Sequence, residues 1–229
     1  MTHEVAELVV DSDELLAEGG FLKMRRLRLR NRRADGTLSD GYVCDGIARP
    51  YGQDAVIVCV FARRTDGGID VLVREGLRPT VYFGRDATVA VLPEPAPAMF
   101  LTELVAGILE VEDRGEPGLR TRAAHETLEE GGFAVEPARV VILGGGMLPS
   151  PGCLVEKFYF TAVEVDPTTQ VALDGDGSPM EEGARTRWLE LDAAIAACVR
   201  GEITDLKTEL GLRRLRDHLR GPPGGVLAD

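Results

Sequence analysis

The sequence predicts an α+β domain built on a mixed β-sheet, and two observations carry this prediction. Strand-like segments cluster around two or three helical ones, without the regular β-α alternation of a parallel sheet. In a chain of 229 residues, the 44% apolar content is enough to build a proper core. The chain contains no internal repeats, and its length suits one large domain with a smaller appendage.

The overall charge, the lack of long apolar stretches and the cysteine spacing exclude several classes to which the protein could belong. A net charge of −12 argues against general affinity for nucleic acid or anionic membranes. No apolar stretch approaches the length of a membrane span, and the N-terminus does not resemble a signal peptide. The cysteines lack the spacing of a zinc site or a disulfide framework. We therefore expect a cytoplasmic protein that binds neither nucleic acid nor membrane.

The first third of the chain predicts strands and one hairpin. Residues 22–30, "LKMRRLRLR", end in alternating Leu and Arg, which indicates a strand with one wet face rather than an anion-binding patch. The apolar run at 54–64, the turn "TDGG" and the run at 69–78 form a convincing hairpin. Residues 85–98 end in a Pro-rich loop of unknown role.

The middle of the chain predicts a helix between extended segments. Residues 99–113 form an extended apolar segment broken at Gly107. The pattern is helical from about 118 to 130, where Gly131 and Gly132 end it. A strand running into a Gly/Pro loop is expected at 138–152, and a strong strand at 154–165.

The last part of the chain predicts a loop, a strand and two helices. Residues 166–183 are a long acidic loop, of the kind that carries function rather than packing. A short strand is expected at 184–191, and helices at 191–201 and 204–219. The end, 221–229, is predicted to be a disordered tail.

Three glutamates stand directly before the glycines that end the central helix. Glu126, Glu129 and Glu130 share one helical stripe, where like charges repel each other. A solvated acidic face, partly neutralised by Arg122, is one explanation, and the ten residues around it alone favour that reading. The topology, however, brings the Ala106 carbonyl within reach of these carboxylates. Such an all-oxygen site suits Mg²⁺ or Mn²⁺ rather than zinc.

Residues 107–133, "GILEVEDRGEPGLRTRAAHETLEEGGF", resemble the Nudix box, G-x5-E-x7-R-E-U-x-E-E-x-G-U, in which U is aliphatic. The matches to its invariant positions are Gly107, Glu126, Glu129, Glu130 and Gly132, and Phe133 takes the last apolar position. This resemblance implies a Nudix-type α/β/α sandwich with a mixed sheet.

Other segments resemble the branch of this superfamily that contains the ADP-ribose pyrophosphatases. They occur in family order and span roughly residues 45 to 219: "REGLRP" (74–79), "ELVAG" (103–107), "PSPGCLVEKFYFTAVEV" (149–165), "EEGARTRWLEL" (181–191) and "GEITDLKTELGLRRL" (201–215). The branch implies three parts: a dimer-forming N-terminal β region at 1–45, a Nudix domain at 46–220 and the tail.

The chain also departs from the family pattern. The box arginine, which orients the neighbouring glutamates, is His125 here, and the next aliphatic position is Thr127. Four extra residues lie between Gly107 and His125, so that Glu116 is the best match for the early box glutamate. Arg122, one helical turn before Glu126, is a candidate substitute for the missing arginine. The stretch from 78 to 103 is longer than the branch leads one to expect.

The resemblance assigns roles to the metal-binding and catalytic candidates. The Ala106 carbonyl, Glu126 and Glu130 would bind the metals, with Glu129 as a further ligand. Two carboxylates of the acidic loop, Glu181 and Glu182, are candidates for the general base, and either one is equally well explained as a solvated loop residue.

The resemblance also assigns roles in substrate binding. Arg78 matches the arginine that contacts the substrate diphosphate, although a surface ion pair is the simpler explanation. Glu156 matches a glutamate near the terminal ribose, with a strand-edge salt bridge as the alternative. Gly107 belongs to the substrate-binding turn.

The implied function is Mg²⁺- or Mn²⁺-dependent hydrolysis of ADP-ribose, or of a related nucleoside diphosphate sugar, to a nucleoside monophosphate and a sugar phosphate. The branch further implies a homodimer. A UDP- or GDP-sugar is the alternative substrate. The alternative of another class is a degenerate Nudix module that binds a nucleotide as a sensor or scaffold. His125 and the irregular box favour that alternative, and the retained glutamates oppose it.

Overall fold

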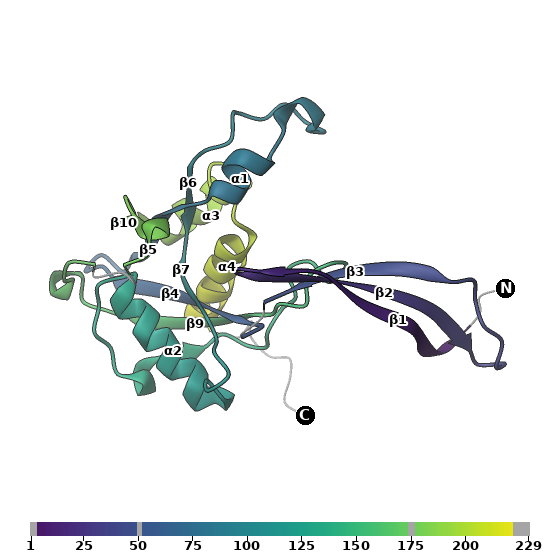
Figure 1. Ribbon diagram of the computed structural model, residues 1–229. Helices are drawn as coiled ribbons and strands as arrows, with labels where there is room; N and C mark the ends of the chain where they lie inside the picture. Colours follow the sequence, from purple (N-terminus) through teal and green to yellow (C-terminus); the bar gives the residue numbers. More distant parts are fainter. Residues whose placement is uncertain (1–3, 50–51, 174–176, 222–229) are drawn as a thin grey trace. The chain divides into compact units, whose positions relative to one another are not determined.

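A computed structural model describes residues 4–49, 52–173 and 177–221, and it divides into two compact units. The first unit comprises Met1–Asp54 and Met147–Lys157, and the second comprises Ala55–Gly146 and Phe158–Asp229 (Figure 1). The predicted tail, apart from Gly221, lies outside the described residues, and so does part of the acidic loop.

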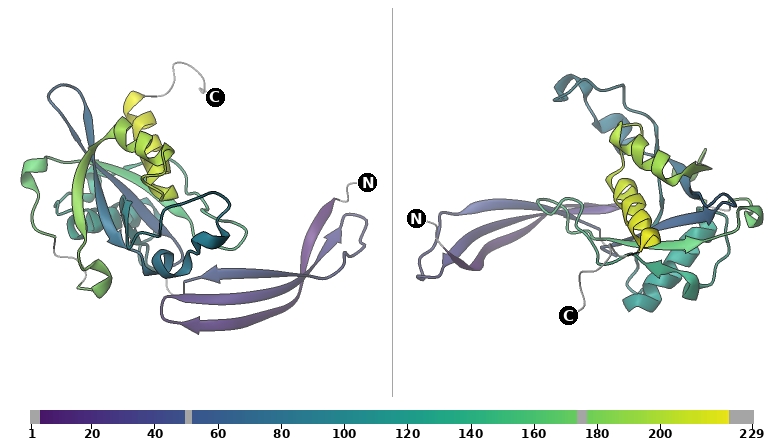
Figure 2. Two further views of the ribbon diagram at one scale, coloured as in Figure 1. Left: turned by 90° about the horizontal axis from the view of Figure 1, so that it is seen from above. Right: turned by 180° about the vertical axis from the view of Figure 1, so that it is seen from behind.

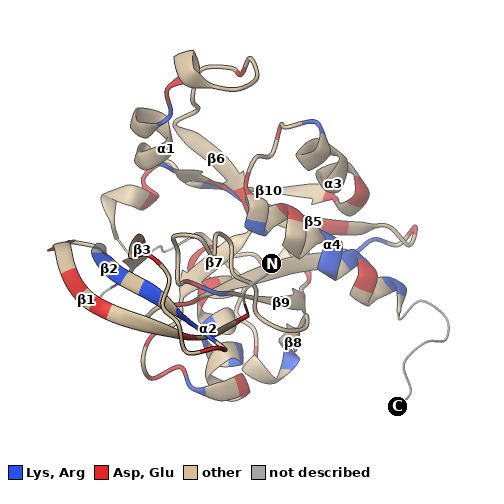
Figure 3. Ribbon diagram, turned by 90° about the vertical axis from the view of Figure 1, so that its right-hand side faces the viewer, with Lys and Arg blue, Asp and Glu red and all other residues tan. Residues whose placement is uncertain are grey.

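The first unit is a three-stranded antiparallel sheet of β1 (Val5–Gly19), β2 (Leu22–Arg33) and β3 (Tyr42–Ala48). The arginines of β2 pair across the sheet with acids of its neighbours, for example Arg26 with Asp45 at 2.7 Å and Arg32 with Glu7 at 2.6 Å (Figure 3). The basic stretch is thus a paired strand face. β1 is longer than its acidic sequence suggests. Asp and Glu disfavour strands, but in this sheet the arginines of β2 face the acids of β1 and balance their charge.

The second unit contains a mixed sheet in the order β10-β5-β4-β9-β8, with β6 pairing with β5 and β7 with β4. The predicted hairpin is confirmed: β4 (Ala55–Arg63) and β5 (Ile69–Leu77) pair antiparallel. β9 (Phe158–Glu164) lies parallel to β4, which makes the sheet mixed. The remaining strands are β6 (Phe100–Glu103), β7 (Val105–Ile108), β8 (Val141–Ile142) and β10 (Arg185–Glu190).

Helices cover both faces of this sheet, which confirms the predicted α/β/α sandwich (Figure 2). The strand β4 is buried on both sides, so alternate residues feed two separate cores. Val56 and Val58 pack toward α2 (Gly115–Glu129), whereas Ile57 and Cys59 pack toward α3 (Leu191–Val199) and α4 (Leu206–Arg220). Burial raises the pKa of the Cys59 thiol to about 12, as expected of an inert core cysteine.

Short helical segments interrupt the loops. α1 (Pro79–Gly84) begins with a proline, whose fixed φ suits the first helical turn. The described part of the chain also contains four 3₁₀ turns: Ala87–Val89, Pro137–Arg139, Pro167–Thr169 and Pro179–Glu181. The segment between β5 and β6 is closed at its base, where the Arg78 N–H donates to the Met99 carbonyl at 2.9 Å.

Two predicted strands are shorter than the sequence indicated. The 138–152 segment contributes only the two residues of β8, because Gly144, Gly145 and Gly146 follow directly. Of the 154–165 segment, residues 154–157 belong to the first unit and only 158–164 pair with β4. Among the described residues, no helix is long and apolar enough to cross a membrane.

Candidate active site

The C-terminal turn of α2 is fixed by the glycines that follow it. Gly132 has a φ of +76°, and its N–H donates to the Leu128 carbonyl at 2.9 Å. This left-handed residue ends the helix and turns the chain inward. Phe133, 1% exposed, then packs edge-to-face on Trp188 of β10, with ring centroids 5.9 Å apart. The last helical turn, which carries the glutamates, is therefore rigidly placed.

Glu126 and Glu130 both lie against the backbone of β7. The Ala106 N–H donates to Glu130 Oε2 at 2.9 Å. A Cβ at Gly107 would collide with the carboxylate of Glu126, so only glycine permits this close approach. Ala106 and Gly107, where the sequence predicted a turn, instead lie within the strand β7, and they adjoin the helix carboxylates. Glu129, on the same stripe, is exposed.

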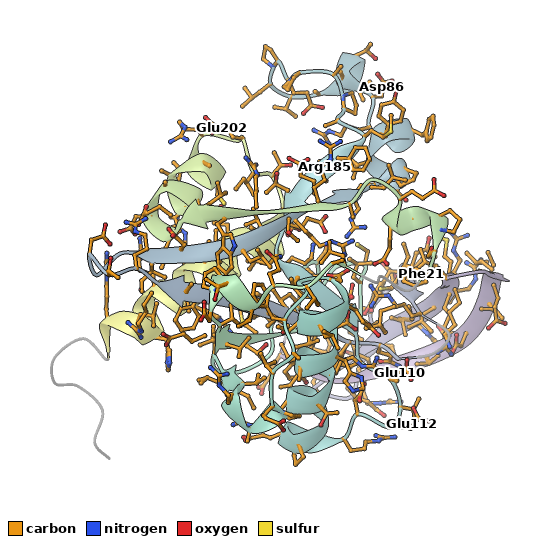
Figure 4. The ribbon with its side chains drawn as sticks, turned by 90° about the vertical axis from the view of Figure 1, so that its left-hand side faces the viewer. Phe21, Asp86, Glu110, Glu112, Arg185 and Glu202 are labelled. Atoms are coloured by element: carbon orange, nitrogen blue, oxygen red, sulfur yellow. The ribbon has the colours of Figure 1, made fainter. Side chains whose placement is uncertain are left out.

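Burial is the main electrostatic feature of Glu126, which is 8% exposed. Burial, together with the negative charge of Glu129, raises the pKa of Glu126 to about 7, although the positive charge of Arg122 opposes the shift. Arg122 Nη1 lies 3.9 Å from Glu126 Oε1, and Arg122 is itself held by Asp113 at 2.9 Å. Its third partner is Glu110, labelled in Figure 4, at 3.3 Å.

These contacts separate the two candidates for the missing box arginine. His125 is exposed on α2, and Arg122 is the side chain that meets Glu126. A guanidinium retains its charge at any relevant pH, whereas a histidine does not. Arg122 therefore supplies the permanent positive charge beside Glu126.

Arg74 of β5 is the central cation of the site, and sequence reasoning did not single it out. It is 7% exposed, forms an ion pair with Glu130, and its Nη2 lies 3.5 Å from Glu181 Oε1. Burial lowers the pKa of the Arg74 guanidinium, against the attraction of Glu181. The sequence did contain a signal for Arg74: it is the first residue of "REGLRP" and directly follows the apolar run "VLV" of a strand, where a charged side chain is unusual.

A pocket of about 300 Å³ opens beside this ion pair. Its polar lining comes from three segments: Arg74, Glu129, Glu130, Ser178, Glu181 and Glu182. Both candidate bases therefore line one pocket with the helix carboxylates. Glu181 is half-buried and meets Arg74, whereas Glu182 is exposed.

A second charged cluster lies across the strand from Arg74. Glu103 of β6 stands opposite Arg74 in the strand register and is 3% exposed. Arg78 Nε donates to Glu103 Oε1 at 2.8 Å, and Lys207 Nζ lies 3.1 Å from Glu103 Oε2. Burial alone would raise the pKa of Glu103, but the hydrogen bond from Arg78 and the charge of Lys207 leave it lowered. The resemblance pointed to Arg78 but to neither of its companions.

Glu156 belongs to the first compact unit, where its carboxylate pairs with Arg49 at 2.7 Å. Arg49 in turn lies over the ring of Phe21, 4.9 Å from its centroid. The salt bridge that the sequence offered as an alternative is thus present.

The chemistry of the carboxylate cluster fits a hard divalent cation. The donors that adjoin β7 are the carboxylate oxygens of Glu126 and Glu130, and glycine at 107 leaves room for Glu126 there. In the described part of the chain, no three acidic, cysteine or histidine side chains are already arranged as a metal site. Glu130 is instead turned toward Arg74, so a bound cation would compete with that guanidinium.

Of three comparisons with known proteins, the one with solved structures found a similar fold. No family model matches this chain, and no curated protein matches it. Among solved structures, the chain is similar to a crystal structure described as an ADP compounds hydrolase, with a TM-score of 0.66. The similarity covers 96% of this chain and 98% of that one, at 11% sequence identity. The likeness supports a Nudix-type fold for this chain.

Proposed function

We propose that this chain is a Nudix hydrolase that cleaves the diphosphate bond of ADP-ribose or a related nucleoside diphosphate sugar. The observation that carries the proposal is the set of carboxylates from α2 and the acidic loop around buried Arg74. The products would be a nucleoside monophosphate and a sugar phosphate. The described function of the similar solved structure, an ADP compounds hydrolase, is consistent with a nucleotide substrate.

In this proposal Glu126 and Glu130 hold Mg²⁺ or Mn²⁺, with Glu129 and the Ala106 carbonyl as further ligands. A divalent metal bound there supplies an activated water and neutralises charge on the diphosphate. Arg122 keeps Glu126 against Gly107 through its ion pair. The glycine gives the carboxylate, and an adjacent substrate, access to the backbone of β7.

The pocket residues supply the proton transfer and the positive charge. Glu181 or Glu182 takes the proton of the attacking water, because both line the pocket beside Glu129 and Glu130. We favour Glu181, since its contact with Arg74 fixes its carboxylate. Arg78 binds the diphosphate oxygens, where a planar guanidinium is well suited.

The remaining parts of the proposal follow from the family resemblance. The chain acts as a cytoplasmic homodimer whose N-terminal β region (1–45) contributes to the partner's site. Glu156 contacts the terminal ribose. A UDP- or GDP-sugar in place of ADP-ribose would leave the same chemistry and change only the base and sugar contacts.

One observation favours a second candidate, a module that binds a nucleotide without turnover. The guanidinium of Arg74 pairs with Glu130, a proposed metal ligand. If this pair is retained in the presence of metal and substrate, the site binds its ligand without hydrolysing it.

Hydrolysis assays decide between these functions. ADP-ribose, UDP-glucose and GDP-mannose are each incubated with the wild type and with Glu130→Gln, in Mg²⁺ or Mn²⁺. Turnover that collapses in the variant supports the hydrolase, and the best substrate identifies its class. A wild type that binds ADP-ribose in calorimetry yet hydrolyses none of the three supports the binding module.

A further inference from the structure

Glu103 is a buried carboxylate on which two cations from distant parts of the chain converge. Arg78 reaches it from the end of β5, and Lys207 reaches it from the first turn of α4. The Glu103 side chain is 5% exposed, and that of Lys207 is 14% exposed. Charges are costly to bury, so this cluster needs a reason to exist.

Joining α4 to the sheet is not a sufficient reason, because uncharged contacts already do so. The Leu104 N–H donates to Thr208 Oγ1 at 2.9 Å, and Thr208 is fully buried. The same hydroxyl donates to Asp205, which also caps the helix by accepting from the Thr208 N–H at 3.0 Å. These bonds fix the start of α4 without Glu103 or Lys207.

The geometry of Arg78 indicates what the carboxylate does. Glu103 accepts from both Nε and Nη2 of Arg78, and the Leu77 carbonyl accepts from Nη1. A guanidinium has five N–H donors in a rigid plane, so these three bonds fix its orientation and leave two donors. The Arg78 side chain is 37% exposed, so it is open to a ligand.

Lys207 adds a second cation at the same carboxylate. Its ammonium has three donors, and its two contacts are Glu103 at 3.1 Å and Asp205 at 3.0 Å. One donor therefore takes part in neither contact. Arg74 stands opposite Glu103 in the register, with its own ion pairs to Glu130 and Glu181, so a third cation lies next to the two that contact Glu103 at this end of the sheet. Such an array suits a polyanion, and phosphate oxygens are its natural partners.

We infer that Glu103 is a positioning residue that aims Arg78 at a phosphate group of the substrate, and that Lys207 is a second phosphate-binding residue. This inference rests on the proposed function for the substrate class, a nucleoside diphosphate sugar. It adds Glu103 and Lys207 to the site.

Affinity for ADP-ribose without metal tests the inference independently of turnover. Titration calorimetry in EDTA compares the wild type with Lys207→Met and Lys207→Arg. The methionine variant is expected to weaken binding about tenfold, the usual cost of one charge-assisted hydrogen bond. The arginine variant, which keeps the cation, is expected to retain most of the affinity. Arg213→Met is the matched control, because Arg213 lies on the same helix in a half-buried pair with Glu209 rather than with Glu103.

Kinetics then separate binding from a structural role. In Lys207→Met the KM should rise about tenfold with kcat nearly unchanged, since a ground-state contact is lost. Glu103→Gln should weaken binding similarly because Arg78 loses its fixed orientation, and the melting temperature shows whether it folds. If Glu103→Gln does not fold, the two variants Lys207→Met and Lys207→Arg still test the inference.

Each outcome bears on one proposal or the other. If Lys207→Met has a lower melting temperature but the wild-type affinity for ADP-ribose and the wild-type KM, the inference is overturned, and the proposed hydrolase function is unaffected. If the wild type does not hydrolyse the substrates, but Lys207→Met binds ADP-ribose more weakly than the wild type does, the inference is supported and the proposed hydrolase function is overturned. If the wild type binds neither ADP-ribose nor inorganic diphosphate, the inference is overturned.

Discussion

Arg74 and Glu130 form an ion pair between the sheet and α2, with side chains only 8% and 11% exposed. Glu130 also accepts from the Ala106 N–H, so the carboxylate is held from two sides. In the absence of metal, this pair neutralises a charge that the fold would otherwise bury alone. The same residue therefore supports the fold and is a proposed metal ligand.

Arg74→Met should lower the free energy of unfolding by about 3 kcal/mol in EDTA, since it leaves Glu130 uncompensated. Added Mg²⁺ should restore part of this loss, and stabilise the variant more than the wild type, because no guanidinium competes for Glu130. Urea unfolding with and without Mg²⁺ measures both effects. Arg63→Met, which breaks the exposed Arg63–Glu164 pair, is the control and should cost little. Equal Mg²⁺ stabilisation of wild type and Arg74→Met would contradict the competition.

Gly107→Ala should lower kcat by about 100-fold, because the new Cβ displaces the carboxylate of Glu126 from the backbone of β7. Steady-state hydrolysis of ADP-ribose measures the change, and circular dichroism confirms the fold. Gly84→Ala serves as the control, since a Cβ at Gly84 meets nothing within 4 Å. Unchanged kcat in Gly107→Ala would show that the position of Glu126 does not matter for turnover.

Glu181→Gln should reduce kcat by about 10²- to 10⁴-fold, the usual contribution of a general base, with KM changed little. Glu182→Gln should have a smaller effect, because Glu182 is exposed and Glu181 is fixed by Arg74. Single-turnover rates for both variants at several pH values provide the comparison. The opposite ranking would make Glu182 the base.

Glu103→Gln should lower stability in a pH-dependent way. The pKa of Glu103 is lowered in the folded protein, so its stabilising contribution is present above the unfolded value of 4.5 and is lost as pH falls through the folded pKa. The wild type should therefore exceed the variant by about 3 kcal/mol at pH 7, and the two should converge in acid.

Urea titrations of both proteins from pH 7 downward measure this difference. If the difference in free energy of unfolding between the two proteins stays constant down to low pH, the charge of Glu103 contributes nothing to stability.

The sequence predicted the layers of the fold better than the contacts of the site. Continuous apolar runs identified β4 and β5, and the glycine pair identified the end of α2, because these signals are local. The topology predicted that the backbone near Ala106 would lie close to the helix carboxylates, but not that Glu126 would lie against Gly107. Arg74 and Lys207 were not found, because their significance depends on partners far away in the sequence, Glu130 and Glu103.

His125 and Arg122 show a partial success, because the one-turn spacing had already made Arg122 the candidate partner of Glu126. The family pattern put attention on position 125, the box position, whereas the ion pair to Glu126 comes from Arg122. Helical spacing alone permitted that pair. Only the burial of Glu126 shows why a permanent cation is needed one turn before it.

The bond from the Arg78 N–H to the Met99 carbonyl gives the intervening segment, 79–98, a particular freedom. Both of its ends are held at adjacent points of the sheet, so changes in its length cost only a slowly growing loop entropy. Insertions or deletions there leave Arg78 and Glu103 in register. In evolutionary terms, this segment is free to diversify in length and sequence without moving the chemistry beside it.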